Sequence, residues 1–261
     1  PKSPLVTDLE RALFPWSAVD LRHLHDRIGN DTRIVIPTGT HHLPYAVHLI
    51  KGLRHLGCQL PITVAYAGDG DLPVPARSYL RHLHVGLLDV SAFVNNTALG
   101  LGGWEVKPFA ALFAPYRHVL LVDADVVFLQ DPATAIFASS EYSQHGAVFF
   151  PDRTLFPGDT GKPAWLSANL PRPLSRRVTA TRMYRRLSAH EQESGVVAID
   201  RRRHFLGLLA AAKLNAKEER EEAFYKTFYG DKESYWIGLE MAGESWTYLH
   251  PTCGVIGELQ I

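Results

Sequence analysis

The sequence has few cysteines and no excess of charge of either sign. Only two of its 261 residues are cysteines, Cys58 and Cys253, which could pair or stay reduced. Two thiols are too few to indicate a redox compartment. Lysine plus arginine and aspartate plus glutamate both number 27, so the formal net charge is zero. This balance argues against a general nucleic-acid binder and against a protein held on an anionic membrane surface.

Long hydrophobic segments are also missing. No stretch of about 18 apolar residues could span a membrane, and neither a signal peptide nor a transit peptide opens the sequence. The sequence starts abruptly at Pro1 and stops just after an apolar segment, so we expect it to be truncated at both ends. The lack of an anchor therefore says little about the full-length protein. The triplet Asn95-Asn96-Thr97 is an N-glycosylation sequon, a weak indication of the secretory route.

The sequence does contain enough apolar residues for a sizeable core. Hydrophobic residues make up 46% and charged residues 21% of the chain. These values exclude a disordered chain and fit one large α/β domain or two small ones. Strand-like runs over 33–37 and 61–66 flank a helical pattern over 45–56. A strand–helix–strand order predicts a right-handed crossover and a parallel sheet.

The most informative stretch is RHVLLVDADVVFLQDP, residues 117–132. Its apolar run over 119–122 is typical of a strand buried on both faces, and the run resumes over 126–129 after Asp123 and Asp125. Carboxylates inside a buried strand are costly unless a cation or donors receive them. Because side chains alternate along a strand, a D-x-D pair shares one face, where it could hold a divalent cation that bridges a diphosphate. The alternative is a solvated turn, or two carboxylates capping the next helix.

Other polar residues occur before this stretch. Thr38 and Gly39 follow the first predicted strand, a position at which open α/β sheets often bind nucleotides, although a plain turn would look the same. Lys107 begins a predicted helix over 106–116 that leads to the aspartates. Its ammonium could fold back toward a phosphate or could be solvated.

Further candidates follow it. Residues 191–200 combine a polar, glycine-containing start with an apolar strand, which lets a backbone approach a ligand closely. Asp231 and Glu233 precede a predicted helix and could either start it or line an active site. The segment 159–186 is rich in proline, arginine and serine, and we expect either a long irregular loop or a lid with a short helix at its end.

Four segments occur in an order that resembles a known family: LLVDADVVFLQDP, GAVFFPDRTLFPGD, HEQESGVVAIDRRRH and GDKESYWIGLEMAGE. Together they are similar to the fungal α-mannosyltransferases of the Mnn1 type, and more distantly to glycogenin-like glycosyltransferases. The similarity extends over about 33–258. D-x-D alone is a common pattern, but its combination with Lys107, ESGVV and GDKE is specific. The FFPDRTL segment favours the α-1,3 branch over the related α-1,2 enzymes.

The resemblance implies a GT-A fold, an α/β domain with a Rossmann-like, mostly parallel sheet flanked by helices. A helical leader over 1–32 would precede one catalytic domain over 33–261, with a donor-binding half over 33–132 and an acceptor-binding half over 133–261. The implied donor is GDP-mannose, the cofactor Mn²⁺ or Mg²⁺, and the acceptor a mannose-containing N- or O-glycan. The implied reaction retains the α configuration. The implied location is the Golgi membrane, with a lumenal catalytic domain and an anchor that this sequence lacks.

The resemblance also implies roles for individual residues. The metal ligands would be Asp125 and Asp123, with His250, the last histidine of the chain, as a third. Asp231 and Glu193 would be the catalytic carboxylates, acting as nucleophiles or orienting the substrates while the acceptor attacks from the same face. The donor-binding residues would be Thr38, Gly39, Lys107, Asp123, Ser194 and Gly195.

Three other interpretations stay open. The chain could be a glycogenin-like transferase that uses a UDP-hexose, because its early strands do not distinguish guanine from uracil. It could be a catalytically silent, glycan-binding subunit of a mannosyltransferase complex, although a pure binder would not need the metal pair. A metal-dependent phosphohydrolase usually needs more clustered ligands than this chain offers. Lys232 stands where the glycogenin-like relatives have glutamine, so the chain departs from their pattern directly beside Asp231.

Overall fold

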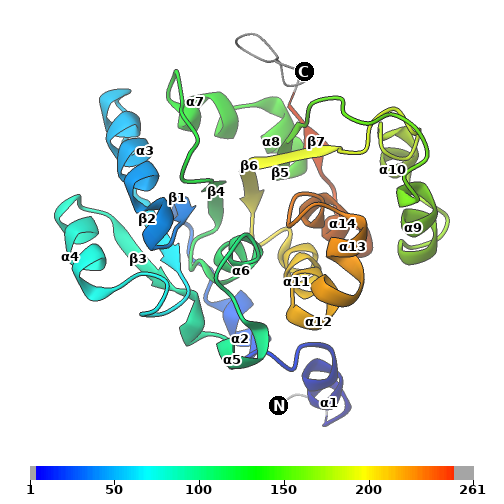
Figure 1. The fold of residues 1–261 in the computed structure, drawn as a ribbon, viewed down its shortest axis with the longest axis horizontal. Coiled ribbons are helices and arrows are strands. Elements are labelled where there is room, and N and C mark those ends of the chain that lie inside the picture. Colours follow the sequence, from blue (N-terminus) through cyan, green and yellow to red (C-terminus); the bar gives the residue numbers. More distant parts are fainter. Residues whose placement is uncertain (1–3, 250–261) are drawn as a thin grey trace.

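The structure, a computed structural model, describes residues 4–249. The strands of this part of the chain form one twisted sheet (Figure 1). Its strand order is β3-β2-β1-β4-β6-β5-β7. The pairs β3-β2, β2-β1, β1-β4 and β5-β7 are parallel, whereas β6 runs antiparallel to both of its neighbours. The predicted α/β class with a mostly parallel sheet is therefore confirmed. The strands are β1 (Thr32–Pro37), β2 (Ile62–Tyr66), β3 (Gly86–Asp89), β4 (His118–Val122), β5 (Ala147–Pro151), β6 (Gln192–Asp200) and β7 (Thr247–Tyr248).

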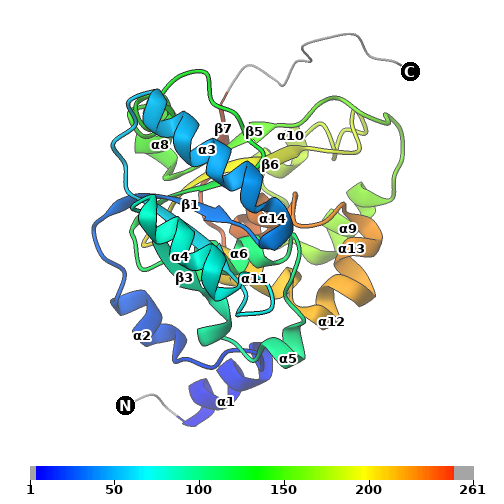
Figure 2. The ribbon, with the colours of Figure 1, turned by 60° about the vertical axis from the view of Figure 1, so that its left-hand side comes forward.

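Helices cover both faces of the sheet. In Figure 2, α3 and α4 lie in front of the sheet, and α6, α11 and α14 lie behind it. Strand β1 shows how the sequence produces two cores: Ile34 and Ile36 join the hydrophobic cluster under α3, and Val35 joins the one under α6, because side chains alternate along a strand. The helices are α1 (Pro4–Leu13), α2 (Leu21–Asp26), α3 (Leu43–His55), α4 (Val74–His82), α5 (Asn96–Leu99), α6 (Val106–Phe113), α7 (Pro132–Phe137), α8 (Ser140–His145), α9 (Lys162–Asn169), α10 (Arg176–Ala180), α11 (Phe205–Leu214), α12 (Lys217–Glu219), α13 (Tyr225–Thr227) and α14 (Ser234–Met241).

Helix α6 is the central helix of the molecule. All eight of its residues are buried, including Lys107, and a helix that is apolar nearly all round is typically enclosed on every side. Behind it, α11 and α14 pack with their backbones almost in contact. A Cβ on Gly238 would lie 2.4 Å from the carbonyl oxygen of Gly207, so larger residues cannot occupy this crossing.

The antiparallel strand β6 joins the two halves of the sheet beside the end of β4. Val122, the last residue of β4, is paired with Val196, and Asp123 N donates a hydrogen bond to Gly195 O at 2.9 Å. The pairing of β5 with β6 shifts register between Val148 and Phe150. The segment that precedes Val196 is thereby placed next to the residues that follow β4.

Two predictions about local structure were wrong. Strand β4 ends at Val122, so Asp123 lies just beyond it and Asp125 lies in a turn, not in the middle of a strand. The apolar run that follows is a loop in which Val127 and Leu129 are exposed. The segment 159–186 has the predicted short helix near its end, α10, which the side chain of Ser175 caps, but a second helix, α9, replaces the predicted irregular loop before it. Its proline and serine residues thus mark helix starts and not a continuous loop.

Other predicted elements agree with the structure to within a few residues. The leader contains two helices, α1 and α2, on either side of Pro15, and the buried side chains of Trp16 and Ile28 join the core under α6. Cys58 is buried. Cys253 and His250 lie outside the described residues, so both the cysteine pairing and the third metal ligand stay predictions.

Candidate active site

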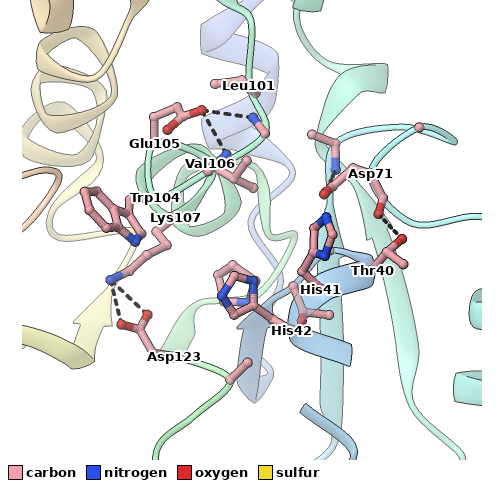
Figure 3. Close-up of a pocket in the computed structure, with 18 of the residues that line it drawn as sticks. Thr40, His41, His42, Asp71, Leu101, Trp104, Glu105, Val106, Lys107 and Asp123 are labelled. Atoms are coloured by element: carbon pink, nitrogen blue, oxygen red, sulfur yellow. Dashed lines mark hydrogen bonds and ion pairs between the residues drawn. The ribbon is translucent and has the colours of Figure 1, made fainter. Parts of the chain in front are cut away.

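A cavity of about 830 Å³ opens at the carboxyl ends of β1, β2 and β4. Strand β2 lies on one side of β1 and β4 on the other, and such a switch in strand order is where open α/β sheets bind their ligands. Most of the lining comes from four segments, 37–42, 70–71, 101–107 and 123–125 (Figure 3). The cavity therefore contains the predicted residues Thr38, Gly39, Lys107, Asp123 and Asp125.

The wall after β1 depends on a close approach of two segments. A Cβ on Gly39 would lie 2.1 Å from the Asp71 carboxylate, so any larger residue here would displace that carboxylate. That carboxylate accepts a hydrogen bond from Ala67 N at 2.8 Å, and the Asp71 carbonyl oxygen accepts one from Thr40 Oγ1 at 2.8 Å. Burial raises the pKa of the Asp71 carboxyl. Thr38 Oγ1 is buried and has no hydrogen-bond partner among the described residues, so it can bond a ligand in the cavity.

The opposite wall is the glycine-rich loop before α6. Glu105 Oε1 accepts hydrogen bonds from Gly102 N and Gly103 N, both at 2.9 Å, which hold this loop against the start of the helix. Trp104 and Lys107 extend from this end of α6 into the same region (Figure 3). Trp104 and Glu105 were not predicted from the sequence, and their nearness to Lys107 in the chain was the available signal. Asp71 and the two lining histidines, His41 and His42, were not predicted as site residues either.

Lys107 is the centre of a buried charge cluster beside the cavity. Its ammonium nitrogen lies 2.8 Å from Asp123 Oδ1 and 3.1 Å from Asp231 Oδ2, and it donates a hydrogen bond to Ser194 Oγ at 3.1 Å. Tyr235 OH donates to Asp231 Oδ2 at 3.1 Å. The members come from α6, the end of β4, the start of β6 and the region of α14, so the fold brings together residues that are far apart in the chain.

The electrostatics of this cluster favour a bound cation. Burial alone opposes the charged form of Lys107, but the carboxylates of Asp231 and Asp123 outweigh it and raise the lysine's pKa above its usual value. Burial raises the pKa of both carboxyls, and the ammonium opposes that shift. Two carboxylates around one ammonium carry one net negative charge when all three are ionised. A further positive group nearby would balance this charge.

Asp125 supplies a second carboxylate at the cavity. It is exposed in the turn after Asp123, and it has no hydrogen-bond or ion-pair partner among residues 4–249. Over the same residues, no three side chains of the metal-binding types cluster closely enough to hold an ion by themselves. Two carboxylates with open coordination positions nevertheless suit a hard divalent cation whose other ligands are diphosphate oxygens and water. The residues present therefore fit the implied metal.

Glu193, predicted as the second catalytic carboxylate, belongs to a different cluster. It is adjacent to Ser194 on β6, where successive side chains point to opposite faces. Glu193 Oε1 accepts a hydrogen bond from Gly195 N at 3.0 Å, and Glu193 Oε2 lies 3.4 Å from Lys232 Nζ. The same ammonium lies 2.6 Å from Oδ2 of Asp152, which is fully buried. Of the two predicted catalytic carboxylates, Asp231 joins the first cluster and Glu193 the second.

Comparison with known proteins identifies the family. Residues 33–261 match the family model described as "Mannosyltransferase putative". The chain belongs to this family. Alpha-1,3-mannosyltransferase MNN1 of Saccharomyces cerevisiae is 24% identical to it over 86% of this chain and 35% of that protein. Alpha-1,3-mannosyltransferase MNT3 of the same yeast is 26% identical to it over 97% of this chain and 46% of that protein. The predicted resemblance to Mnn1-type proteins is thus confirmed, and the chain spans about a third to a half of the length of these relatives.

Solved structures agree with this assignment at the level of the fold. The bifunctional glycosyltransferase WbbM superimposes with a TM-score of 0.50 and 11% sequence identity, over 84% of this chain and 39% of that protein. At this identity the likeness concerns the fold alone. The fold likeness, the mostly parallel sheet and the D-x-D turn that follows β4 together support the GT-A fold that the resemblance implied.

Proposed function

We propose that this mannosyltransferase-family chain is the catalytic domain of a metal-dependent, retaining α-1,3-mannosyltransferase. Its donor would be GDP-mannose and its acceptor a mannose-terminated N- or O-glycan. The observation that carries the proposal is the buried Lys107 ammonium held between Asp123 and Asp231 at the edge of the cavity. The choice of sugar and linkage rests on the names of the similar yeast proteins.

The donor would extend along the cavity from the end of β1 to the end of β4. Thr38 Oγ1 and the backbone at Gly39 would contact the nucleoside. A divalent cation, Mn²⁺ or Mg²⁺, held by Asp125 and Asp123 would neutralise the charge that develops on the leaving diphosphate. Lys107 would donate to a donor oxygen on the same side of the site, and Ser194 and Asp231 would border the sugar. Positive charge fixed in advance where negative charge develops is an effective source of rate acceleration.

Transfer with retention would proceed by attack from the same face. The bond between the sugar C1 and the diphosphate oxygen breaks, the acceptor hydroxyl forms the new bond to C1, and its proton passes to the diphosphate oxygen. Asp231 would orient the sugar, because it is buried and is already bonded to Tyr235 and Lys107. Glu193 would serve the acceptor side, because Lys232 and Gly195 N hold its carboxylate. A covalent route would need Asp231 or Glu193 to attack C1 first, although both carboxylates are already held by hydrogen bonds and lysine ammonium groups.

The cellular setting belongs to the same proposal. The full-length protein would act in the Golgi lumen and would contact the membrane through an anchor outside this sequence. The exposed sequon residue Asn95 is compatible with the secretory route. Within residues 4–249, no helix has both the length and the apolar character needed to cross a membrane.

The decisive experiment measures GDP release from GDP-mannose, with and without Mn²⁺ and an α-mannoside acceptor. We expect metal-dependent turnover that Asp125→Ala lowers by at least about 100-fold, because the substitution removes a metal ligand. Asp125 is exposed, so the variant should melt at the wild-type temperature. The matched control is Asp26→Ala, which removes an exposed aspartate on α2 that is not among the residues lining the cavity, and should leave turnover unchanged.

Parallel assays separate the alternative functions. Turnover of UDP-glucose or UDP-galactose in place of GDP-mannose would overturn the donor assignment and favour a glycogenin-like transferase. Intact binding of a mannose glycan without turnover of any donor would instead favour a silent subunit of a mannosyltransferase complex. Metal-dependent turnover of GDP-mannose that persists in Asp125→Ala would show that this aspartate is not a metal ligand.

A further inference from the structure

Four aromatic rings form a continuous row that starts at the cavity. We define this aromatic row as Trp104, Tyr229, His190 and Phe156. Trp104 lines the cavity, and its ring centroid lies 5.3 Å from that of Tyr229. The Tyr229 and His190 centroids are 6.3 Å apart, and those of His190 and Phe156 are 6.5 Å apart. These rings come from the loop before α6, the turn before α14, and the segments that flank β5 and β6.

The row is unusually exposed for aromatic side chains. Relative exposure is 54% for Trp104, 61% for Tyr229 and 70% for Phe156. Single exposed apolar residues are ordinary on protein surfaces, but connected aromatic rings next to a cavity indicate a surface that binds something. Among the described residues, these three rings belong to neither of the two hydrophobic core clusters.

The backbone holds the rings in place. Gly230 has a φ of +61°, and a Cβ there would lie 2.9 Å from Trp104 Cε3, so Trp104 rests directly on this glycine. Phe156 has a φ of +49°, a conformation that costs a bulky residue free energy and that tends to occur where a function requires it. On either side of it, Ala189 N donates to Leu155 O and Gly158 N donates to Arg186 O. Phe156 is thus presented on a fixed turn.

Polar groups lie along the same row. His190 is neighboured by the charges of Lys232 and Asp152, which together with Glu193 form the second lysine cluster. Burial and the nearby ammonium groups of Lys162 and Lys232 lower the pKa of His190, which keeps its ring neutral. Neutral rings beside hydrogen-bonding groups match the chemistry of a sugar, which has an apolar C–H face and a rim of hydroxyls.

We infer that the aromatic row is the binding platform for an oligosaccharide acceptor, whose terminal sugar reaches the cavity while the preceding sugars stack on Tyr229 and Phe156. The inference rests on the proposed function, which it extends by predicting that an acceptor of several sugars binds more tightly than a single sugar. Continuity with the cavity selects this occupant, because a chain that starts at the reaction centre must leave along an adjoining surface. Lys232 and Glu193 would bond its hydroxyls, and the buried Asp152 would hold the Lys232 ammonium in place.

The test compares short and long acceptors. We would measure KM for methyl α-mannoside and for an α-linked mannotetraose with wild type and Phe156→Ala. The substitution should raise KM for the tetraose about fivefold, because one stacked ring is lost, and should change KM for methyl mannoside less than twofold. Phe156→Trp should restore the wild-type KM. The matched control is Tyr79→Ala, which removes an exposed aromatic residue on α4 outside the row and should change neither value.

Direct binding distinguishes this inference from the proposed function. Mannotetraose affinity, measured by calorimetry without any donor, should also fall about fivefold in Phe156→Ala. If no donor is turned over but this difference persists, the platform stands and mannosyl transfer fails. If transfer from GDP-mannose is normal, yet Phe156→Ala changes both acceptors equally or not at all, the platform is overturned and the transferase stands.

Discussion

Two lysine side chains, each held between two carboxylates, contact the first residues of β6. The two side chains differ in how accessible they are to solvent. The Lys107 side chain is 7% exposed and bridges Asp123 and Asp231. The Lys232 side chain is 18% exposed and bridges Asp152 and Glu193. In each cluster one carboxylate is nearly inaccessible, Asp231 and Asp152 respectively. The partly accessible one is Asp123 in the first case and Glu193 in the second.

Strand β6 contacts both clusters through neighbouring residues. Ser194 contacts Lys107, and its neighbour Glu193 contacts Lys232, so the alternation of side chains along β6 separates the two clusters. The Lys107 cluster borders the cavity in which the donor would bind. The Lys232 cluster adjoins the aromatic row. Similar charge arrangements therefore lie on the cavity side and on the aromatic-row side of the same strand.

The largest effect is expected from Lys107→Met. The substitution leaves Asp123 and Asp231 without their ammonium, and breaking a buried ion pair costs about 3 to 5 kcal/mol. Urea denaturation in EDTA at pH 7.5 would measure this loss. Lys51→Met, which removes an exposed lysine on α3, is the matched control and should change stability by less than about 0.5 kcal/mol. A loss below about 1 kcal/mol in Lys107→Met would contradict the view that this cluster depends on its cation.

A smaller loss of about 1 to 2 kcal/mol is expected from Lys232→Gln. Lys232 is more solvated than Lys107, and glutamine keeps a hydrogen-bond donor for Asp152. Kinetics should separate the two lysines further: this variant should raise the acceptor KM more than it lowers donor hydrolysis without acceptor. Should it instead destabilise the protein more than Lys107→Met, the distinction between a buried and a partly solvated cluster would be wrong.

A third effect concerns Glu233, which follows Lys232 and supports the start of β6. Its carboxylate accepts hydrogen bonds from Glu191 N, Gln192 N and Trp236 Nε1, yet complete burial raises its pKa to about 7. The folded protein therefore holds this proton more tightly than the unfolded chain does. Stability should fall as pH rises from about 4.5 to 7, by up to about 1.4 kcal/mol per pH unit from this group.

Glu233→Gln tests this pH dependence. Urea denaturation at pH 5, 6 and 7 would give the slope for each protein. The variant cannot ionise, so its stability should decrease with pH less steeply than that of wild type, whatever its absolute value. Equal slopes for the two proteins would show that Glu233 does not titrate in this range.

The sequence predicts the parts of the site that depend on local pattern. Continuous apolar runs located β1 and β4, and the interruption by aspartates located the edge of the cavity. Hydrophobicity alone could not tell where β4 ends, because Val127 and Leu129 are apolar but exposed in a loop. The end is set by pairing with β6, which involves residues far along the chain.

The second cluster and the aromatic row could not be predicted for the same reason. Asp152 and Lys232 are 80 positions apart, and neither lies in a pattern that indicates a partner. The one available signal was that Lys232 stands where the glycogenin-like relatives have glutamine. This difference did not indicate that Asp152 is the partner of Lys232. The exposure of Trp104 and Tyr229 depends on how two loops meet at Gly230, which a hydrophobic pattern does not show.

The hydrogen bond from Asp123 N to Gly195 O has a consequence for folding. Together with the contact between Lys107 and Ser194, which spans 87 positions, it makes the Lys107 cluster a product of long-range pairing. Loop closure over such a distance must precede any gain from these contacts, so the cluster should assemble late on the folding pathway. A fragment that ends near residue 132 would form β1, β2 and β4 without the strand that fixes the D-x-D turn. We therefore expect the segments 33–132 and 133–249 to fold as one cooperative unit.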